Sequence, residues 1–592
     1  RRGRPLGAAG IATARGARMR RFMGRRLRSG LLGVLALAAI FAQTHGVMAG
    51  PCGEDEAAGW SGLEQAALRS LAGGLPFDAA AASISPEFVR ELLTCEALAG
   101  TLPDGTVVLR NAVLSGPLDL ARRTVLPRFE CEGCRIPALY ASESEWRNQL
   151  TLTGTAILGD ADFSFATFRS SLLLSGSAVA GVLDLFSAEL GGDLLILDGS
   201  KIAALAAESV AVQRSVELGG SEIWDYADLW GASIGRDLVL TGSWADGALE
   251  SWTVIGAGAT KAELMAVDAT SPAVRSLGSA KIDRRIDISN AQIRGRLDMD
   301  AVRIAEDLWL RGCSVVAGPI KLVFARIGQN VDLSSTILGD VEMTGARVGG
   351  ELRLGAPDGR LTAPVWAPGA RLSLRNVELS SWTDATGNPA PRPPDCPPAK
   401  GPADPWPRKI DVIGFSYRNV GGYGGGSPVL QHDVDWFCNW LERQQPYSFE
   451  PYQHAAAYLR GVGLEDAADD VLYCGKVLQI ENTPSWTGKF ALQVQRAFVG
   501  FGYRVERSIL WALLFIFIGQ QVFSRTKEAK AQNMPYGLAY SIEMFIPALS
   551  LRPLHRSIEI AGWQRYYFYL HKFMGWVLGS FVVATFLGLL GR

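Results

Sequence analysis

The sequence predicts a mainly β protein, in which a parallel β-helix of pentapeptide-like repeats precedes a small helical domain and two C-terminal transmembrane helices. Three observations support this. An aliphatic-x-aliphatic triplet recurs about every eleven residues through the middle of the 592-residue chain. Turn residues follow many of these triplets, and the chain has 66 glycines, which suits a turn-rich β architecture. Two long apolar stretches lie near the C-terminus.

The repeat is clearest in three triplets, Ile286–Ile288, Leu297–Met299 and Leu308–Leu310, each starting eleven residues after the previous one. In an extended backbone the first and third side chains of a triplet share a face. Because these residues are aliphatic, we expect that face to point inward. The middle residues, among them Asp287 and Trp309, are then expected to face outward.

One triplet is too short to bury a core alone, but stacked triplets bury a continuous one and pair strand on strand. We expect two triplets per coil, so that about eleven coils of roughly 22 residues stack from Val107 to Leu354. A period of eleven is also compatible with a right-handed coiled coil. The glycine in most units and the β-rich triplets disfavour that alternative. The pattern blurs over 245–277, where we expect an insertion or an irregular coil.

The pattern divides the chain into six predicted regions: 1–49, a basic leader and signal peptide; 50–106, a helical N-terminal cap; 107–356, the β-helix; 357–427, a Pro/Gly-rich connector with a last strand pair; 428–500, a helical domain; and 501–592, a membrane module. The leader has a basic stretch, an apolar stretch (Leu31–Ala42) and small residues before a cleavage point after Ala49. An uncleaved anchor is the alternative. Either way the following chain is exported.

Cysteine usage is compatible with export. Cys52 and Cys95 flank a short helical segment, Cys131 and Cys134 form a C-x-x-C motif, and Cys438 and Cys474 bracket a helical pair. We expect disulfides or free thiols at these positions. Redox chemistry is disfavoured, because the C-x-x-C motif lacks a thioredoxin-like βαβ context.

The membrane module contains predicted spans at about 508–523 and 573–590, with a re-entrant or interfacial segment at about 534–551. The loop between the spans carries seven basic residues, so the positive-inside rule places it in the cytoplasm: Arg525, Lys527, Lys530, Arg552, Arg556, Arg565 and Lys572. The prediction is a bacterial inner-membrane protein whose β-helix is periplasmic.

Composition excludes several kinds of chemistry. No histidine lies between His45 and His432, which removes histidine-based triads and zinc sites from the repeat region. The net charge of -1 argues against nucleic-acid binding. No motif predicts a cofactor, a metal site or a catalytic centre. The middle residues Asp184, Asp287, Asp298 and Asp332 could form an outward ladder, but we expect a solvated face.

Glu543 is the most suggestive polar residue, because an acid in an apolar membrane segment is often functional. Together with Pro547 it is the candidate functional pair of the membrane module. The alternative is an interfacial helix whose glutamate lies among lipid headgroups.

The C-terminal part resembles a known family. The segments 446–472, 502–523, 540–551 and 563–590 occur in an order similar to that of bacterial membrane proteins with pentapeptide-like repeats and a C-terminal two-span module. Some members are labelled membrane-associated oxidoreductases, a label for which this chain has no cofactor motif. The resemblance implies a β-helix joined to a membrane module, and it supplies no catalytic residues.

The function predicted from the sequence is a non-enzymatic, membrane-anchored envelope protein that presents a β-helix rod for binding or scaffolding. Its expected partners are the lipid bilayer and an envelope protein or glycan, and homo-oligomers are allowed. Two alternatives remain: an oligomeric ion channel or sensor that uses the two-span module, and a glycan-active β-helix enzyme.

Overall fold

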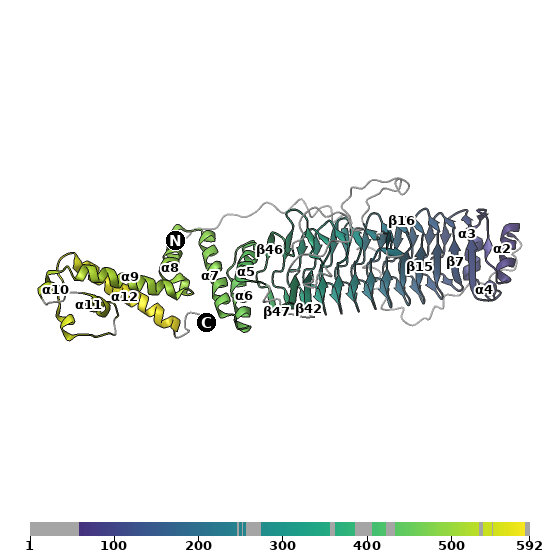
Figure 1. Cartoon of the computed structure of the whole chain (residues 1–592). Coiled ribbons are helices and arrows are strands. Elements are labelled where there is room, and N and C mark those ends of the chain that lie inside the picture. The colour runs from purple at the N-terminus through teal and green to yellow at the C-terminus, as the bar shows by residue number, and fades with distance from the viewer. Residues whose placement is uncertain are drawn as a thin grey trace, which may run out of the picture. The chain divides into compact units, whose positions relative to one another are not determined.

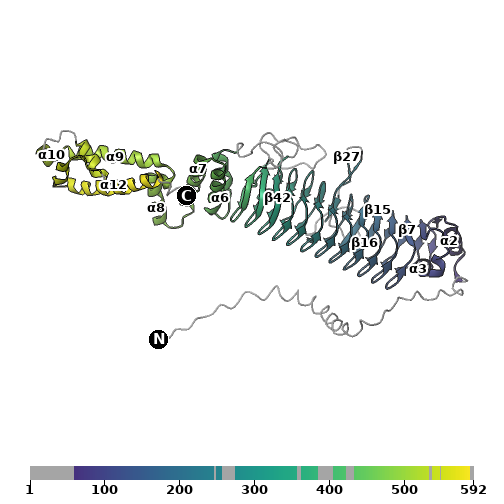
Figure 2. The same cartoon turned by 90° about the horizontal axis from the view of Figure 1, so that it is seen from below.

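The computed structural model describes residues 59–245, 248–251, 253–255, 274–355, 362–384, 405–421, 432–531, 537–546 and 549–586. The predicted leader (1–49), Cys52 and Pro547 lie outside the described residues. The described chain forms a parallel β-solenoid followed by a helical C-terminal region (Figures 1 and 2).

The register of the strands explains the eleven-residue period. Leu150 pairs with Phe129 in the preceding coil and with Leu172 in the next, so the same wall returns after 21 or 22 residues. Ala161, which opens the triplet between them, pairs with Leu139 and Leu183 on another wall. Successive triplets therefore alternate between two walls, and the prediction of two triplets per coil is confirmed over about 10 turns.

Four walls of parallel strands surround the core, two in each large sheet. The first wall is β1 (Phe77–Asp78), β3 (Thr106–Arg110), β7 (Arg128–Glu132), β11 (Leu150–Thr153), β15 (Leu172–Ser175), β18 (Leu194–Leu197), β21 (Val216–Glu217), β25 (Leu238–Val239), β31 (Ile286–Asp287), β35 (Leu308–Trp309), β39 (Val331–Asp332), β42 (Arg347–Leu354), β45 (Glu378–Asp384) and β47 (Ser416–Val420). The second, which shares the last three strands, is β6 (Thr124–Val125), β10 (Glu145–Trp146), β14 (Thr167–Phe168), β17 (Glu189–Leu190), β20 (Ala211–Val212), β24 (Ser233–Ile234), β30 (Lys281–Ile282), β34 (Arg303–Ile304) and β38 (Arg326–Ile327).

The other large sheet supplies the remaining two walls. The third is β2 (Ser83–Ile84), β4 (Val113–Leu114), β8 (Arg135–Ile136), β12 (Ala156–Ile157), β16 (Ala178–Asp184), β19 (Lys201–Ala206), β22 (Glu222–Ile223), β28 (Thr253–Ile255), β32 (Ala291–Ile293), β36 (Val315–Val316), β40 (Ile337–Leu338) and β43 (Val365–Trp366). The fourth, which shares β16 and β19, is β5 (Leu118–Asp119), β9 (Leu139–Tyr140), β13 (Ala161–Asp162), β23 (Ala227–Asp228), β29 (Val274–Ser276), β33 (Arg296–Asp298), β37 (Ile320–Lys321), β41 (Val341–Glu342), β44 (Arg371–Ser373) and β46 (Lys409–Asp411).

The core is a continuous column of aliphatic side chains with a few aromatic layers. Both ends of a triplet are buried, as Leu308 and Leu310 are. The Trp146 and Phe168 rings stack within the column, with centroids 5.4 Å apart. Burying one such leucine contributes about 1.5–3 kcal/mol, so the stability of the solenoid grows with each added coil.

The N-terminal cap contains α2 (Gly62–Ala72), α3 (Pro86–Thr94) and α4 (Glu96–Ala99). It also contains strands β1 and β2, which pair with β3 and β4, so the first coil starts inside the region predicted to be helical. Glu64 connects the N-termini of α2 and α3. Its carboxylate accepts hydrogen bonds from Ser61 N (2.7 Å) and Ser85 Oγ (2.5 Å), and Ser61 and Ser85 are the N-cap residues of these two helices. Burial raises the pKa of Glu64, but these hydrogen bonds outweigh burial and the net pKa is lowered.

The solenoid continues past its predicted end at residue 356. Strands β43 to β47 add further coils up to Val420, within the segment predicted to be a connector with one last strand pair. Here Val341 pairs with Leu372 and Arg371 with Lys409, so paired positions are farther apart in the sequence than in the earlier coils, which hides the period. The blurred stretch around 245–277 includes an antiparallel hairpin of β26 (Ser243–Ala245) and β27 (Ala248–Ser251) inside a coil.

The helical region begins with helices that close the C-terminal end of the solenoid. The Trp382 ring of β45 lies 5.5 Å, centroid to centroid, from Trp440 of α5. A disulfide between Cys438 and Cys474 joins α5 to α7. The elements are α5 (Val434–Glu442), α6 (Glu450–Gly461), α7 (Glu465–Asn482), α8 (Trp486–Val499), η3 (Gly500–Gly502), α9 (Val505–Phe523), α10 (Lys527–Ala531), α11 (Leu538–Phe545), η4 (Pro553–Ser557) and α12 (Gln564–Phe586). Helix α8 was not predicted from the sequence.

The prediction of two transmembrane helices is not supported. Among the described residues one helix, α9, is long and apolar enough to cross a membrane, and it contains the first predicted span. The second predicted span, 573–590, falls in α12, which starts earlier and carries Arg565, His571 and Lys572 in its first half. These polar residues lower the hydropathy of the helix as a whole. Residues 587–590 lie outside the described chain.

Candidate functional site

The aspartates in the middle of the triplets shape the corners of the coil. Asp184 Oδ1 accepts a hydrogen bond from Phe186 N at 2.9 Å, and Asp298 Oδ1 accepts one from Asp300 N at 3.1 Å. The residue three positions after each aspartate, Ser187 or Ala301, has a left-handed backbone with φ of 53° or 57°. Each carboxylate therefore satisfies an N–H group in a tight turn, as aspartate commonly does.

Two of these aspartates correct the sequence prediction. Asp287 and Asp332 do not face solvent, since their residues are only 9% and 0% exposed. Asp332 Oδ1 accepts a hydrogen bond from Ser334 N at 3.0 Å, which is the same turn contact, and its Oδ2 is buried without a partner. The predicted outward ladder is therefore interrupted.

Trp309, the third middle residue of the clearest repeat, packs between two arginines. The Arg285 and Arg311 guanidinium groups lie 4.5 Å and 3.7 Å from its ring centroid. Because a cation favours the face of an indole ring, these contacts hold Trp309 in place.

Acidic residues gather on the fourth wall of the solenoid. Burial raises the pKa of Asp228, and the nearby Asp298 carboxylate raises it further. Burial likewise raises the pKa of Asp300, with a contribution from Asp298. Across the described chain no group of three or more His, Cys, Asp or Glu side chains is placed to hold a metal ion.

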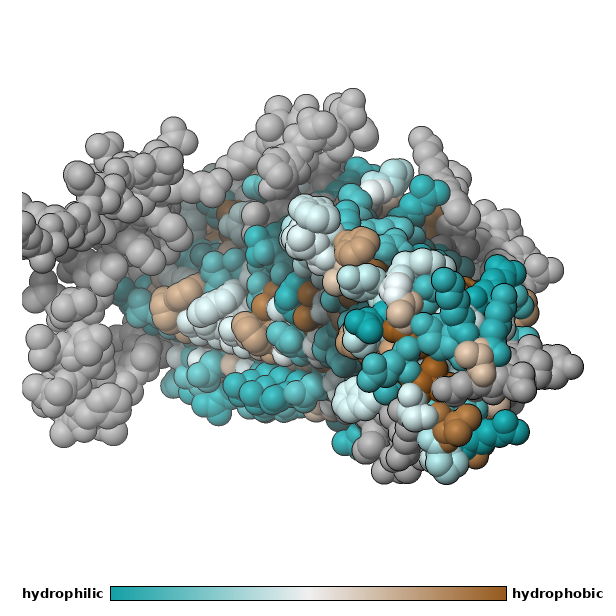
Figure 3. All heavy atoms as spheres, turned by 90° about the vertical axis from the view of Figure 1, so that its left-hand side faces the viewer, coloured by the Kyte–Doolittle hydropathy of each residue, from teal (hydrophilic) through white to brown (hydrophobic). Residues whose placement is uncertain are grey.

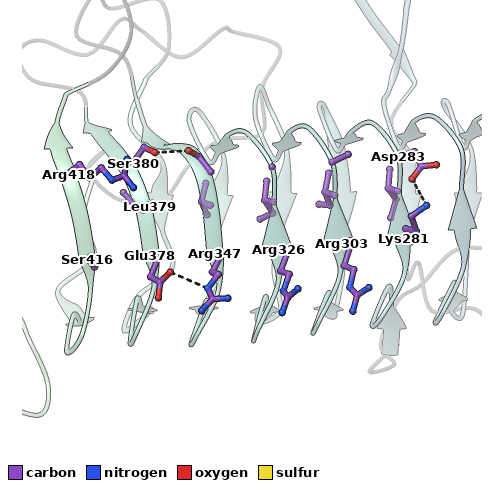
Figure 4. Close-up of a pocket in the computed structure, with 17 residues that line it drawn as sticks. Lys281, Asp283, Arg303, Arg326, Arg347, Glu378, Leu379, Ser380, Ser416 and Arg418 are labelled. Carbon is purple, nitrogen blue, oxygen red and sulfur yellow. Dashed lines mark hydrogen bonds and ion pairs between the residues drawn. The ribbon is translucent and has the colours of Figure 1, made fainter.

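A groove on the second wall is the best candidate for a binding site. Its volume is about 670 Å³, within the usual range for ligand sites. We name it the basic groove, because basic side chains line it from five strands: Lys281, Arg303, Arg326, Arg347 and Arg418. Figure 4 shows Arg303, Arg326 and Arg347 side by side on successive strands.

Strand register brings four of these basic residues into one row. Lys281 pairs with Arg303, Arg303 with Arg326, and Arg326 with Arg347. Each therefore occupies the same position in its coil, immediately before an aliphatic residue that points into the core. Neighbouring strands lie about 4.8 Å apart, so the row repeats a positive charge along the solenoid axis.

The ends of the row are neutralised and its middle is not. Lys281 Nζ lies 2.8 Å from Asp283 Oδ1, and Arg347 Nε lies 3.1 Å from Glu378 Oε2. Arg303 and Arg326 are exposed, and neither has a side-chain hydrogen bond or an ion pair within the described residues. The middle of the groove therefore carries two positive charges free to meet an anion.

Two glycines, Gly328 and Gly349, line the groove in neighbouring coils. A Cβ on Gly328 would collide with the carbonyl of Ala305 in the preceding coil, and a Cβ on Gly349 would collide with the carbonyl of Gly328. Glycine is therefore required at both positions for the coils to approach each other. These two positions therefore add no side chain to the groove beside the arginine row.

The basic groove was not predicted, although the sequence contains a signal for it. The pairs Arg303-Ile304, Arg326-Ile327 and Arg347-Val348 recur at spacings of 23 and 21 residues. These pairs lie between the triplets, at the single aliphatic positions that enter the core from another wall.

The predicted membrane-module residue Glu543 lies buried in α11, and its partner comes from η4. Glu543 Oε2 lies 2.5 Å from His555 Nδ1 and accepts a hydrogen bond from Arg552 N at 3.3 Å. Among the described residues, Glu543 Oε1 has no hydrogen-bond partner. A cavity of about 480 Å³ adjoins the pair and is lined by Tyr540, Glu543, Met544, Leu549, His555, Ile558, Phe568, Lys572 and Trp576.

Polar residues also occupy the contact between α9, α11 and α12. His571 Nε2 lies 3.0 Å from Ser541 O, and the Tyr567 hydroxyl donates to Phe515 O at 3.1 Å. Ser541 Oγ donates to Ile516 O at 2.8 Å. Hydrogen bonds thus hold these three helices together at positions where the solenoid would use aliphatic packing.

Large apolar side chains point away from these helices. Leu510 and Phe517 of α9 are 67% and 58% exposed, and Trp576 of α12 is 69% exposed. In α8, Trp486 and Phe490 are exposed on one face. Figure 3, which views the molecule from the side where α10 and α11 lie in Figure 1, shows hydrophobic residues at the surface among hydrophilic ones.

The predicted cysteine pairs lie in two structural settings. Cys131 and Cys134 are bonded to each other within the solenoid, and Cys438 is bonded to Cys474 between helices. Cys95 is also disulfide-bonded. The described chain contains no free cysteine, so these residues act as covalent links.

Comparisons with protein-family models, curated proteins and solved structures find no match. They lend no support to the family resemblance drawn from the C-terminal segments. Fold and geometry together define the class: a parallel β-solenoid protein with a helical C-terminal region and a basic groove on one wall.

Proposed function

We propose that this chain is a non-enzymatic, membrane-anchored envelope protein whose solenoid presents the basic groove to an anionic partner. The observation that carries the proposal is the pair of exposed arginines, Arg303 and Arg326, on neighbouring strands of the groove, which have no acidic partner among the described residues. Some arginines elsewhere on the solenoid surface meet glutamates, as Arg169 meets Glu145 at 2.6 Å. What distinguishes Arg303 and Arg326 is that they lie on neighbouring strands of one groove. An unpaired guanidinium fork is well suited to bind carboxylate, sulfate or phosphate groups.

Two features support membrane attachment. Helix α9 has the length and the exposed apolar surface of a membrane span. The exposed apolar face of α8, which contains Trp486 and Phe490, suits a helix lying at the membrane interface.

The charge pattern around α9 supports a periplasmic solenoid. Basic residues after α9 favour a cytoplasmic location for that end. Arg504 precedes α9, and its positive charge by itself would favour a cytoplasmic location for the solenoid end of the helix. This effect is reduced because Asp470 partly neutralises Arg504 at 2.6 Å. The proposed location is the bacterial inner membrane, with the solenoid on the periplasmic side.

Cysteine labelling in cells tests the proposal. Ser416→Cys introduces a thiol in the basic groove, and Ser233→Cys introduces a matched thiol on the same wall outside it. We expect a membrane-impermeant maleimide to reach both thiols once the outer membrane is permeabilised. The groove thiol should react more slowly in cells than in the purified full-length protein, because the partner covers it.

Two results would overturn the proposal. Labelling that requires lysis of the inner membrane would place the solenoid in the cytoplasm. Equal labelling rates of the Ser416→Cys variant in cells and after purification would mean that the groove has no occupant. The unmodified chain is the control for background reaction.

A further inference from the structure

The basic groove has a direction and a repeat that select one class of anion. Its row of charges runs along the solenoid axis at one residue per coil, from Lys281 to Arg347. Three strand intervals of about 4.8 Å give the row a length of about 14 Å. A single phosphate or carboxylate ion would use one or two of these positions and leave the others unmatched.

We propose that the basic groove binds a linear acidic glycan, a polymer of uronic acid units, lying parallel to the solenoid axis. This inference rests on the proposed function and names the partner's chemistry. An extended acidic chain carries one carboxylate per sugar unit, so it can present successive anions to successive coils. Arg303 and Arg326 at the centre form the bidentate contacts.

The lining of the groove favours a glycan over a nucleic acid. Proteins that bind single-stranded nucleic acid stack the bases on aromatic side chains. The residues lining the groove include no aromatic residue; they are arginine, lysine, acidic, small polar and aliphatic residues, and glycine or alanine. Ser416 adds an exposed hydroxyl at one end, which can exchange hydrogen bonds with sugar hydroxyls, and Ser380, whose Oγ donates to Gly349 O at 2.6 Å, can still accept one.

The solenoid also limits where this partner can bind. On the same wall, the positions equivalent to Arg303 in earlier coils are Glu145, Thr167, Glu189, Ala211 and Ser233. None of these is basic, and two are acidic. An acidic glycan would therefore be held over the last coils and repelled from the earlier ones.

Calorimetric titration with oligogalacturonates of defined length tests the inference, using the full-length chain in detergent. We expect affinity to rise with length until the oligomer covers the row and to change little beyond that. The double variant Arg303→Gln/Arg326→Gln should bind at least about tenfold more weakly, because two charged contacts are lost.

A matched double variant controls for total charge. Arg123 and Arg135 are exposed, lie outside the groove and have no ion pair within the described residues. Arg123→Gln/Arg135→Gln should change the affinity by less than about twofold, because exposed charges at a distance are screened. Thermal unfolding of both double variants should match that of the parent chain.

Several results would overturn the inference. The first two are that no oligogalacturonate binds, or that neutral dextran binds with the same affinity. The others are that the two double variants weaken oligogalacturonate binding equally, or that a single-stranded polynucleotide binds more tightly than the oligogalacturonates do. Failure here is distinguishable from failure of the proposed function. If the Ser416→Cys thiol is protected in cells while oligogalacturonates do not bind, the groove has an occupant of another chemistry.

Discussion

The solenoid and the C-terminal helices distribute polarity in opposite ways. In the solenoid, aliphatic residues such as Leu308 are fully buried, and charged residues such as Arg303 are exposed. In the helices, Ser541 and His571 are fully buried, whereas Leu510 is 67% exposed. The solenoid surface is therefore mostly polar over an aliphatic core, whereas the last helices combine buried polar groups with exposed apolar side chains around small apolar clusters.

This difference has a physical reason. Water drives apolar groups together, so the solenoid is stabilised by its column of leucine, isoleucine and valine. Lipid provides no such force between helices, and polar contacts and close packing hold them together instead. The hydrogen bonds of Ser541 and His571 suit that situation, which is why the contrast supports the proposed membrane anchor.

The largest expected effect comes from placing a charge in either region. Leu308→Asp puts an unpaired carboxylate in the solenoid core at a cost above about 4–5 kcal/mol, so the solenoid should fail to fold. Leu510→Asp should leave the solenoid folded, and the protein should be extracted from the membrane more easily. Circular dichroism and carbonate extraction measure the two outcomes. A folded Leu308→Asp solenoid, or an unchanged extraction profile for Leu510→Asp, would contradict the comparison.

A smaller effect is expected from breaking the buried polar pair of the helical module. His555→Ala removes the partner of Glu543 and should cost roughly 3–5 kcal/mol within α11 and its neighbours. Hydrogen exchange should rise in α11 while the solenoid stays protected. Glu559→Gln is the matched control, because Glu559 is exposed in the same segment. Loss of protection in both regions would show that they unfold as one unit.

The smallest effect sharpens the role of the triplet aspartates. Asp162 Oδ1 accepts hydrogen bonds from Ser164 N at 2.9 Å and from Ser164 Oγ at 2.6 Å, before a left-handed Phe165. Asp162→Ala should destabilise the solenoid by about 1 kcal/mol, and Asp162→Asn should restore most of that loss. Chemical unfolding measures both. An equal loss for the two variants would mean that the carboxylate charge matters more than the turn.

The spacing of aliphatic residues in the sequence was enough to predict the coils of the solenoid. A triplet such as Leu150–Leu152 alternates its side chains between two faces, and that alternation depends only on extended backbone geometry. The eleven-residue spacing then predicted two triplets per coil, because strands of the same wall pair when the chain comes back to that wall after about 22 residues. The helix starts at Ser85 and Pro86 were equally local, since capping involves neighbours in sequence.

Other features could not be predicted because they depend on residues far apart in the chain. Asp332 follows the same local pattern as Asp298, yet the folded structure buries it completely. The pairing of Glu543 with His555 depends on the packing of α11 against η4. The later coils escaped prediction because the positions that pair in them, such as Arg371 and Lys409, do not keep the spacing of the earlier coils.

The sequence by itself determined the repeating coil and the apolar character of α9, because alternation and hydropathy are properties of neighbouring residues. Only the tertiary structure decided where function can lie. Lys281, Arg303, Arg326 and Arg347 form one row because parallel pairing brings positions 21 to 23 residues apart within a strand spacing of each other. Gly328 and Gly349 line the groove beside them and let the coils approach.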